Sequence, residues 1–426
     1  MLRQSSFGKS EKFMSNGTRN YSLDKSKIKF LLLEGIHASA GELIQGHGYN
    51  NVEILRSALM GDELKQALQG VHFLGIRSRT QLDAEALAAA DRLAAVGCFC
   101  IGTNQVALPA AAGCGIPVFN APFSNTRSVA ELALAEAILL MRGIPQRNAA
   151  AHRGEWIKSA THSHEIRGKT IGIIGYGHIG SQLGILAESL GMRVIYYDIE
   201  HKLPLGNADN RSSLWDLLNE SEVVSLHVPE TPLTTNLVDA KFLKGMKAGS
   251  FLINASRGQV VEIDSLADAL ESGHIAGAAI DVFPVEPGSN NEPFESRLRG
   301  HDNVILTPHI GGSTIEAQEN IALEVAGKLV KYSDNGTTRS AVNFPQVSLP
   351  DHQGASRILH IHRNEPGVLQ QINQVFSEQE VNVASQYLDT RDEIGYVVMD
   401  VETANPQQLL NGLRGIPSTI RARILH

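Results

Sequence analysis

The stretch KTIGIIGYGHIG, residues 169–180, decides the fold expected for much of this chain. Its first half is a β-branched apolar run that predicts a buried parallel strand, and this run leads directly into Gly175-x-Gly177-x-x-Gly180. Gly175 permits a tight turn, Gly177 lets the backbone approach a ligand, and Gly180 lets helix and strand pack closely. Because a helix that starts here has free N–H groups, the pattern predicts a pyrophosphate site at its N-terminus.

The residues beyond the glycines support a dinucleotide site. A helical pattern ends at Gly191, and a strand from Met192 to Tyr197 follows and leads to Asp198. An acid about twenty residues after such glycines binds the ribose hydroxyls of a dinucleotide. Its charge would repel the extra phosphate of NADP, so the sequence favours NAD, although the basic residues His201 and Lys202 lie nearby.

The composition indicates a globular protein of more than one domain. The chain has 426 residues, 42% of them hydrophobic and 19% charged, which is too long for one ordinary core. No apolar run approaches the roughly 20 residues of a membrane span, and the polar N-terminus lacks the apolar core of a signal peptide. A net charge of -8 disfavours a general nucleic-acid surface. The three cysteines form no C-x-x-C pair, so we expect reduced thiols, a cytoplasmic protein and no metal site.

Short apolar strands alternate with helical stretches from residue 26 to about residue 124, after a polar segment, residues 1–25, that predicts a mobile extension. This alternation is typical of a parallel sheet covered on both faces. Arg77, Ser78 and Arg79 follow one of the predicted strands, and Arg56 follows an earlier one. Since ligands bind at the carboxyl ends of parallel strands, these residues are candidate ligands.

A single long apolar helix is predicted from Val129 to about Ala151, directly after the polar residues 125–128. Such a helix suits a spine between two lobes or a subunit contact. In the segment that follows, His162 and His164 lie without a carboxylate or thiol at ligand spacing, so a solvated loop is favoured over a metal site.

Three charged or titratable residues lie just past the ends of later predicted strands, namely Arg257, Glu286 and His309. Because such strand ends share one edge of a parallel sheet, we expect the three to converge on a nicotinamide. Alcohol oxidation needs a base that works near neutral pH, which is the range of imidazole, so His309 is the predicted base. Glu286 would orient it, and Arg257 would grip a carboxylate or carbonyl oxygen. Asp281 is the expected acceptor for the cofactor carboxamide.

The pattern changes from residue 356 onwards. Strand, helix, strand, strand, helix and strand follow one another, which is typical of a ferredoxin-like β-α-β-β-α-β domain, and the proline-containing residues 346–355 predict a linker. In the first of these strands the period of two places His360 and His362 on one face. The pattern leaves open whether this domain binds a ligand or only supports oligomerisation.

With these motifs in view, the chain resembles the D-2-hydroxyacid dehydrogenase family, and within it the bacterial serine-pathway phosphoglycerate dehydrogenases that carry a C-terminal ACT domain. The resemblance extends from about residue 25 to the end. The strings that carry it are RSRT at 77–80, NAPFSNT at 120–126, IGYGHIG at 174–180, NASRG at 254–258 and TPHIGG at 307–312.

Pattern and resemblance together predict an α/β protein with two doubly wound parallel-sheet lobes and a ferredoxin-like ACT domain. The flavodoxin-like substrate-binding lobe is expected at 26–124 and 313–345, and the Rossmann NAD-binding lobe at 125–312. The linker follows, and the ACT domain occupies 356–426.

The resemblance also assigns residues. The family's catalytic arginine, glutamate and histidine match Arg257, Glu286 and His309. Its NAD contacts match Gly175, Gly177, His178, Ile179, Gly180, Asp198, Ala255, Ser256, Arg257, Asp281, His309, Ile310, Gly311 and Gly312. Its substrate contacts match Arg56, Arg77, Ser78, Arg79, Asn125 and Lys158, with Lys158 expected to reach across a subunit boundary.

A homotetramer inhibited by L-serine is implied as well, with serine bound between paired ACT domains by His362, Asn364 and Asn382. Imidazole and amide groups can bind the carboxylate, ammonium and hydroxyl groups of an amino acid. Two departures from the family pattern stand out. Arg56 stands where the family tends to have lysine, which keeps the charge but alters its geometry. Gln353-Gly354 replaces the usual glycine pair of the hinge, so we expect a stiffer or weaker coupling between serine and catalysis.

The predicted activity is the NAD-dependent oxidation of 3-phospho-D-glycerate to 3-phosphooxypyruvate, the first step of L-serine biosynthesis. Two alternatives remain at this level. One is a reductase for another 2-oxo acid, such as 2-oxoglutarate or hydroxypyruvate, which the arginine cluster disfavours. The other is a non-catalytic NAD-sensing binding protein, which the intact arginine, glutamate and histidine set disfavours.

Overall fold

The computed structural model describes residues 23–425 apart from 289–290, 352–355 and 404. The chain divides into two compact units. The first consists of Met1–Ile36, Ala40–Asn120 and Val325–His426, and the second of His37–Ser39 and Ala121–Glu324. Most of the predicted N-terminal extension and the Gln353-Gly354 hinge lie outside the described residues.

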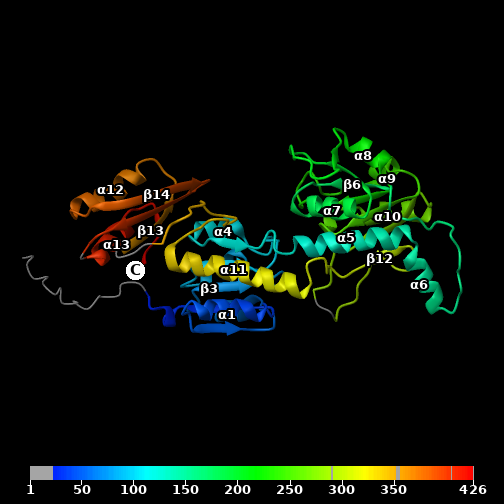
Figure 1. Cartoon of the computed structure of the whole chain (residues 1–426). Coiled ribbons are helices and arrows are strands. Elements are labelled where there is room, and N and C mark those ends of the chain that lie inside the picture. The colour runs from blue at the N-terminus through cyan, green and yellow to red at the C-terminus, as the bar shows by residue number, and fades with distance from the viewer. Residues whose placement is uncertain (1–22, 289–290, 352–355, 404, 426) are drawn as a thin grey trace, which may run out of the picture. The chain divides into compact units, whose positions relative to one another are not determined.

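A five-stranded parallel sheet lies in the first unit (Figure 1). Its strand order is β2-β1-β3-β4-β5, the flavodoxin-like order in which ligands bind beyond the carboxyl ends of the strands. The strands are β1 (Lys29–Leu32), β2 (Asn51–Ile54), β3 (Phe73–Ile76), β4 (Ala95–Cys98) and β5 (Val118–Asn120). The helices of this part of the sequence are η1 (Lys25–Lys27), α1 (Ala38–Gly46), α2 (Gly61–Ala67), α3 (Ala84–Ala89) and α4 (Leu108–Gly113).

A seven-stranded parallel sheet forms the centre of the second unit. Its order is β12-β11-β10-β9-β6-β7-β8, so the direction of winding reverses between β6 and β9. Dinucleotides bind at such a switch point. The strands are β6 (Thr170–Ile174), β7 (Arg193–Tyr197), β8 (Asp209–Asn210), β9 (Val223–Leu226), β10 (Ser250–Asn254), β11 (Ile275–Ile280) and β12 (Val304–Leu306).

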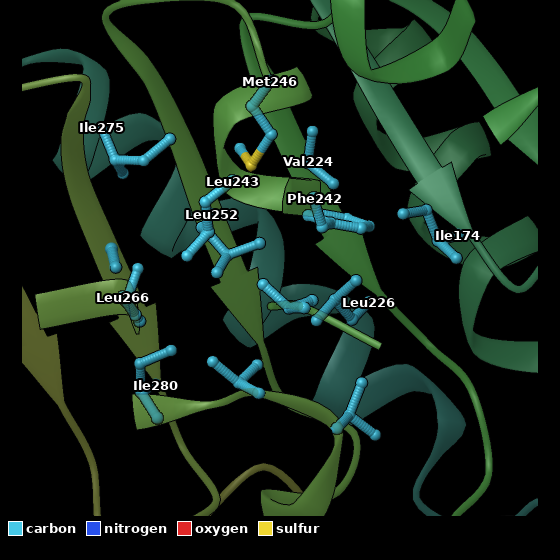
Figure 2. Packing of buried hydrophobic residues seen from close by; sticks show 14 of the residues in the cluster. Ile174, Val224, Leu226, Phe242, Leu243, Met246, Leu252, Leu266, Ile275 and Ile280 are labelled. Atoms are coloured by element: carbon cyan, nitrogen blue, oxygen red, sulfur yellow. The ribbon is translucent and has the colours of Figure 1, made fainter. Parts of the chain in front are cut away.

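Helices cover this sheet and exclude water from it. Figure 2 shows Leu226 and Leu252 of the sheet pointing toward Phe242 of α9 and Leu266 of α10 in one buried apolar cluster. Burial of such side chains contributes roughly 25 cal/mol per Å² of apolar surface, which holds the strand ends in fixed positions. The helices of this part of the sequence are α5 (Thr126–Met141), α6 (Ile144–His152), α7 (His178–Ser189), α8 (Leu214–Glu220), α9 (Ala240–Gly245), η2 (Gly258–Val260) and α10 (Ile263–Glu271). Helix α11 (Ile315–Asn335) follows, and its residues from Val325 onwards belong to the first unit, where Val325 and Leu329 lie against Gly97 of β4.

The prediction of one long helix from Val129 to about Ala151 is wrong. Two helices, α5 and α6, occupy this region, and Gly143 between them adopts a left-handed conformation with φ 58°. Pro145 lies in the first turn of α6, where its missing N–H costs nothing, but it could not continue α5. The apolar pattern continues across the break and therefore predicted one helix. The glycine, which often ends a helix, and the proline two residues later, which often begins one, were the signals of the break.

The C-terminal residues form an antiparallel sheet of four strands in the order β14-β15-β13-β16. Helices α12 and α13 pack on one face of it around Ile358, Phe376 and Leu409 (Figure 1). The elements are β13 (Ser356–Arg363), α12 (Val368–Glu378), β14 (Val383–Arg391), β15 (Ile394–Val401), α13 (Pro406–Arg414) and β16 (Thr419–Leu425). The predicted fold class, two parallel-sheet lobes and a ferredoxin-like domain, is confirmed.

Candidate active site

The glycine turn connects β6 to α7 at the switch point of the seven-stranded sheet. A Cβ atom on Gly175 would lie 2.3 Å from the carbonyl oxygen of His227, and one on Gly180 would lie 2.2 Å from the carbonyl oxygen of Gly175. A Cβ on Gly177 would meet no atom of the described residues within 4 Å. The open space beside Gly177 and the free N–H groups at the start of α7, which begins at His178, fit a bound pyrophosphate.

Asp198 lies directly after β7 and is bonded to this turn. Its Oδ2 atom accepts the backbone N–H of Tyr176 at 2.8 Å, and its Oδ1 atom accepts the N–H of Glu200 at 2.9 Å. These bonds fix the carboxylate where the dinucleotide fold places its ribose ligand. The glycine turn and this acid together fit NAD.

His309 and Glu286 form a hydrogen-bonded pair. The Nδ1 atom of His309 lies 2.9 Å from Oε2 of Glu286, and Oε1 of Glu286 accepts the backbone N–H of Phe283 at 3.1 Å. In the described part of the chain the other ring nitrogen of His309, Nε2, makes no hydrogen bond. The structure therefore brings the predicted base and its predicted orienting acid together and leaves Nε2 available to a substrate.

The pKa values of this pair have moved in opposite directions. The hydrogen bond to Glu286 raises the pKa of His309 above its ordinary value, and this outweighs the opposing effect of burial. Burial alone would raise the pKa of Glu286, but hydrogen bonds from His309 and Phe283 and the charge of Arg257 hold it below its ordinary value. The carboxylate thus stays ionised at neutral pH, and the proton on Nδ1 stays in place while Nε2 accepts one.

Asp281 fixes the turn that carries His309. Its side chain is 1% exposed, and its Oδ1 atom accepts the Thr307 hydroxyl at 2.6 Å and the Ile310 N–H at 2.8 Å. Its Oδ2 atom accepts the Gly311 N–H at 2.8 Å, and the N–H of His309 donates to the carbonyl of Asp281 at 2.8 Å. Sequence reasoning missed this contact, although β11 and β12 are neighbours and their ends had to meet. The carboxamide role of Asp281 stays a prediction.

Arg257 lies in a loop that packs against the segment leading to Glu286. Its Nη1 atom donates to the carbonyl of Ser256 at 2.7 Å, and the Ser256 hydroxyl donates to Oδ1 of Asn254 at 2.7 Å. A Cβ on Gly258 would lie 2.0 Å from the carbonyl oxygen of Phe283, so only glycine permits this close approach. The packing explains why the charge of Arg257 acts on the pKa values of both Glu286 and His309.

The candidate substrate arginines of the first unit share one edge of the five-stranded sheet. Arg56 follows β2, and Arg77 and Arg79 follow β3. Between them lies Glu34, 4% exposed, whose Oε1 accepts the N–H groups of Arg77 at 3.1 Å and Thr80 at 2.9 Å. Its Oε2 accepts the N–H of Arg79 at 3.0 Å. Glu34 was not predicted, although its place just past β1, between β2 and β3, was a signal.

The other two predicted substrate residues differ in their surroundings. Asn125 is buried just before α5, and a Cβ on Gly312 would lie 2.3 Å from its Nδ2 atom, so it packs against the His309 turn. Lys158 is exposed in the loop after α6. Its expected place across a subunit boundary stays a prediction.

The sequence patterns did not indicate two further residues beside the site, Phe123 and Glu136. The Phe123 ring lies 4.0 Å, centroid to centroid, from the imidazole of His178 at the glycine turn. On α5, Glu136 is 1% exposed, and neither carboxyl oxygen has a hydrogen-bond partner among the described residues. Burial and the charge of Asp281 raise the pKa of Glu136 to about 8, so this group is neutral at pH 7. The apolar pattern of α5 concealed it.

In the C-terminal domain two of the predicted serine ligands, His362 and Asn364, lie at the end of β13, whereas Asn382 precedes β14 at the opposite end of the sheet, level with the start of β13. His362 is 2% exposed, its Nδ1 lies 2.8 Å from the carbonyl oxygen of Arg363, and its buried Nε2 has no partner among the described residues. A Cβ on Gly395, opposite in β15, would lie 2.2 Å from this ring. Asn364 donates to the carbonyl of Asp392 at 3.2 Å, and Asn382 is exposed just before β14.

Comparison with known proteins identifies the family. The model of the D-isomer specific 2-hydroxyacid dehydrogenase, NAD binding domain, matches residues 134–311, and that of the AHAS small subunit-like ACT domain matches residues 358–421. The D-3-phosphoglycerate dehydrogenase of Haemophilus influenzae is 64% identical over 409 residues, which cover 96% of this chain and 100% of that protein. The chain belongs to the D-3-phosphoglycerate dehydrogenase family.

Other members and solved structures agree with this membership. The D-3-phosphoglycerate dehydrogenase of Escherichia coli is 62% identical over 407 residues, covering 95% of this chain and 99% of that protein. The D-lactate dehydrogenase of Aquifex aeolicus, solved with NAD and lactic acid, covers 71% of this chain and 96% of its own, with a TM-score of 0.63 and 25% identity. The predicted family and the NAD-binding fold are thereby confirmed, whereas the roles of individual residues stay proposals.

Proposed function

We propose that this member of the D-3-phosphoglycerate dehydrogenase family oxidises 3-phospho-D-glycerate with NAD to 3-phosphooxypyruvate and so opens L-serine biosynthesis. The observation that carries the proposal is the His309–Glu286 pair, 2.9 Å apart, at the end of the NAD-binding sheet. A base oriented by a carboxylate is what proton removal from a secondary alcohol requires.

His309, Glu286 and Arg257 have separate roles in the proposed reaction. Nε2 of His309 takes the proton of the C2 hydroxyl, and Glu286 stabilises the imidazolium that results. Arg257 binds the substrate carboxylate and polarises the C2 oxygen with its planar fork. Bound NAD supplies the hydride acceptor. Asp281 holds the turn so that His309 keeps its orientation.

The phosphate of the substrate is assigned to the cations that follow strands of the first sheet. Arg77 and Arg79 carry it, with Arg56, Ser78, Asn125 and Lys158 as further contacts. This assignment makes residues 26–124 and 313–345 the substrate-binding domain, 125–312 the NAD-binding domain and 356–426 the ACT domain. Glu34 binds the backbone N–H groups of Arg77 and Arg79, and this supports the assignment, since a loop that is already ordered loses less entropy on binding.

A comparison of phosphorylated and unphosphorylated substrates tests this function. With NADH absorbance as the readout, kcat/KM for 3-phospho-D-glycerate should exceed that for D-glycerate by at least about 100-fold, and Arg79→Gln should reduce the ratio about 10-fold or more. Arg299→Gln, an exposed arginine paired with Glu295, is the matched control and should leave the ratio unchanged. Equal rates would favour the reduction of another 2-oxo acid, and no NADH with either acid would favour a binding protein.

The pH dependence of oxidation should change in Glu286→Gln. His309 must be unprotonated at Nε2 to act as base, so the rate rises as pH rises through its pKa, which Glu286 holds above the ordinary value. Glutamine lacks the charge, so the pKa of His309 falls, the acid limb of kcat against pH moves to lower pH, and the plateau drops on the order of 100-fold. Glu295→Gln serves as an exposed control. An acid limb at the wild-type pH in Glu286→Gln would contradict the pairing.

We further propose a homotetramer in which L-serine, bound between paired ACT domains, inhibits the enzyme. The ACT match at residues 358–421 supports the regulatory domain. The unpartnered Nε2 of buried His362 and the amide of exposed Asn364 supply the polar groups that an amino acid needs.

Asn364→Ala should abolish inhibition by L-serine and leave the uninhibited rate unchanged. Allosteric coupling free energies are typically about 1–3 kcal/mol, which corresponds to a 5- to 150-fold change caused by the effector. Initial rates measured at increasing concentrations of L-serine will show inhibition of this size in the wild-type enzyme. Asn411→Ala, an exposed amide on α13, is the control and should keep the inhibition. Wild-type inhibition in Asn364→Ala would rule out the proposed site.

The cysteines bear on the location of the protein. Cys98, Cys100 and Cys114 form no disulfide bond in the structure, which suits the reducing cytoplasm that we propose. In the described ranges no helix combines the length and the apolar character of a membrane span.

A further inference from the structure

A cavity of about 450 Å³ lies within the first unit, where the antiparallel sheet meets the five-stranded sheet. Residues of α13 and β16 line one side of it. Residues just before β1, β3 and β4 and at the end of α11 line the other. This volume is in the range of small-molecule sites. None of the residues proposed above for NAD, substrate or serine lines it.

The charged residues of this cavity are mostly cations. Among the described residues they are Lys25, Arg92, Arg414, Arg421 and Arg423, and Asp334 supplies the one carboxylate side chain of the lining. Asp334 is already bonded to Nζ of Lys25 at 2.7 Å and to the hydroxyl of Tyr49 at 2.6 Å. Arg92 has Asp91 at 3.6 Å. The three arginines of α13 and β16 therefore carry the excess of positive charge.

These three arginines use only carbonyl groups and a ring as partners within the described residues. Arg421 donates to the carbonyl of Leu93 at 2.5 Å, and Arg414 to that of Ala422 at 3.4 Å. Arg423 donates to the carbonyl of Tyr332 at 3.1 Å and lies 4.5 Å over its ring, while its buried Nε has no acceptor. Most of their N–H groups are thus left for a further acceptor.

Arg357 in the same domain shows how a buried arginine is neutralised. Its side chain is fully buried, and its Nε and Nη2 atoms bind the two oxygens of Asp400 at 2.6 and 2.8 Å. Arg421 and Arg423 are half-buried without a carboxylate partner among the described residues, so they lose part of the hydration of their charge without such compensation. Consistent with this, burial and the charge of Arg423 lower the pKa of Arg421. Burial and the charges of Arg92 and Arg423 likewise lower that of His72, a residue of the same cavity.

We propose that this cavity is a second ligand site, which binds a small phosphorylated metabolite. Guanidinium forks recognise phosphoryl oxygens in pairs, and the three forks of Arg414, Arg421 and Arg423 suit a ligand of two or more negative charges. Phe73, Leu410 and Tyr49 provide an apolar wall for its carbon part. Since β16 lies on one side and β3 on the other, the ligand would join the ACT domain to the parallel-sheet domain.

Calorimetry with pyrophosphate on the full chain tests this site. The titration is carried out with saturating NADH, which occupies the glycine turn. The chain used, called the background chain, also carries Arg77→Gln and Arg79→Gln, which remove the proposed substrate phosphate site. We expect one site per chain with a Kd below about 1 mM at 0.15 M salt. Arg414→Gln with Arg423→Gln should weaken binding at least about 10-fold, whereas Arg391→Gln, an exposed arginine of β14, should not.

If the double variant does not fold, the single variant Arg414→Gln tests the proposed site. Arg414 is exposed, so its replacement leaves the core intact. It should weaken pyrophosphate binding by at least about threefold while NADH binding stays at the wild-type level. Absence of pyrophosphate binding in the background chain would overturn the proposal, as would equal affinity in the cavity variants. Binding of citrate but not of pyrophosphate would overturn the phosphoryl specificity.

Discussion

Replacement of His309 by glutamine should lower kcat for 3-phospho-D-glycerate about 10²- to 10⁴-fold, the usual contribution of a general base. Glutamine can still hydrogen-bond Glu286, but it cannot take up the proton of the C2 hydroxyl. NADH binding should change little, because the glycine turn and Asp198 are separate from this side chain. The checks are initial rates by NADH absorbance and the Kd of NADH by fluorescence.

His301→Gln is the matched control for this prediction, since it removes a half-buried imidazole close in sequence and should leave the rate near that of wild type. If His309→Gln kept more than roughly a tenth of wild-type kcat with NADH still bound, the base would have to be another group.

Replacement of Glu34 by alanine should raise KM for 3-phospho-D-glycerate about 10- to 100-fold and lower the free energy of unfolding by about 2–5 kcal/mol. Three backbone N–H groups, those of Arg77, Arg79 and Thr80, lose a charged acceptor at once. Arg77 and Arg79 are then no longer held in place. Steady-state kinetics and urea unfolding measure the two effects.

Glu34→Gln keeps the shape with one weaker acceptor, so its effects should lie between those of wild type and alanine. Glu53→Ala removes an exposed carboxylate on neighbouring β2 and should change neither quantity by much. An unchanged KM in a folded Glu34→Ala enzyme would show that the arginine loop does not bind the substrate phosphate.

The proximity of the candidate catalytic residues could be predicted because it follows from the ends of strands. Arg257, Glu286 and His309 each come soon after an apolar strand, and β10, β11 and β12 are neighbours in the sheet. Once the strands are recognised as parallel, their carboxyl ends must share an edge. The His309–Glu286 pair therefore needed no long-range information beyond the order of the strands.

The supporting contacts could not be predicted in the same way. Glu34 and Asp281 bind the backbone of neighbouring loops, and such bonds leave no periodic signal in the sequence. They depend on which loops lie side by side, which only the sheet order supplies. Glu136 was missed for a different reason, since a buried neutral carboxyl in an apolar helix looks like an interruption of the pattern.

The basic cavity could not be predicted from the sequence either. Arg421 and Arg423 alternate with apolar residues in β16, a pattern that predicts one buried and one solvated face. In the structure the second face of this sheet packs as well, because a Cβ on Gly336 would lie 2.5 Å from the side chain of Leu359. Which domain covers that face is a tertiary fact that the strand pattern does not contain.

If His309 removes the proton of the C2 hydroxyl, the hydrogen on C2 must leave as a hydride, for which bound NAD would be the acceptor. Incubation of the enzyme with NAD and 3-phospho-D-glycerate deuterated at C2 tests this directly by mass spectrometry. We expect reduced cofactor that carries one deuterium for each 3-phosphooxypyruvate formed. Loss of the deuterium to water, or no reduced cofactor at all, would contradict this mechanism.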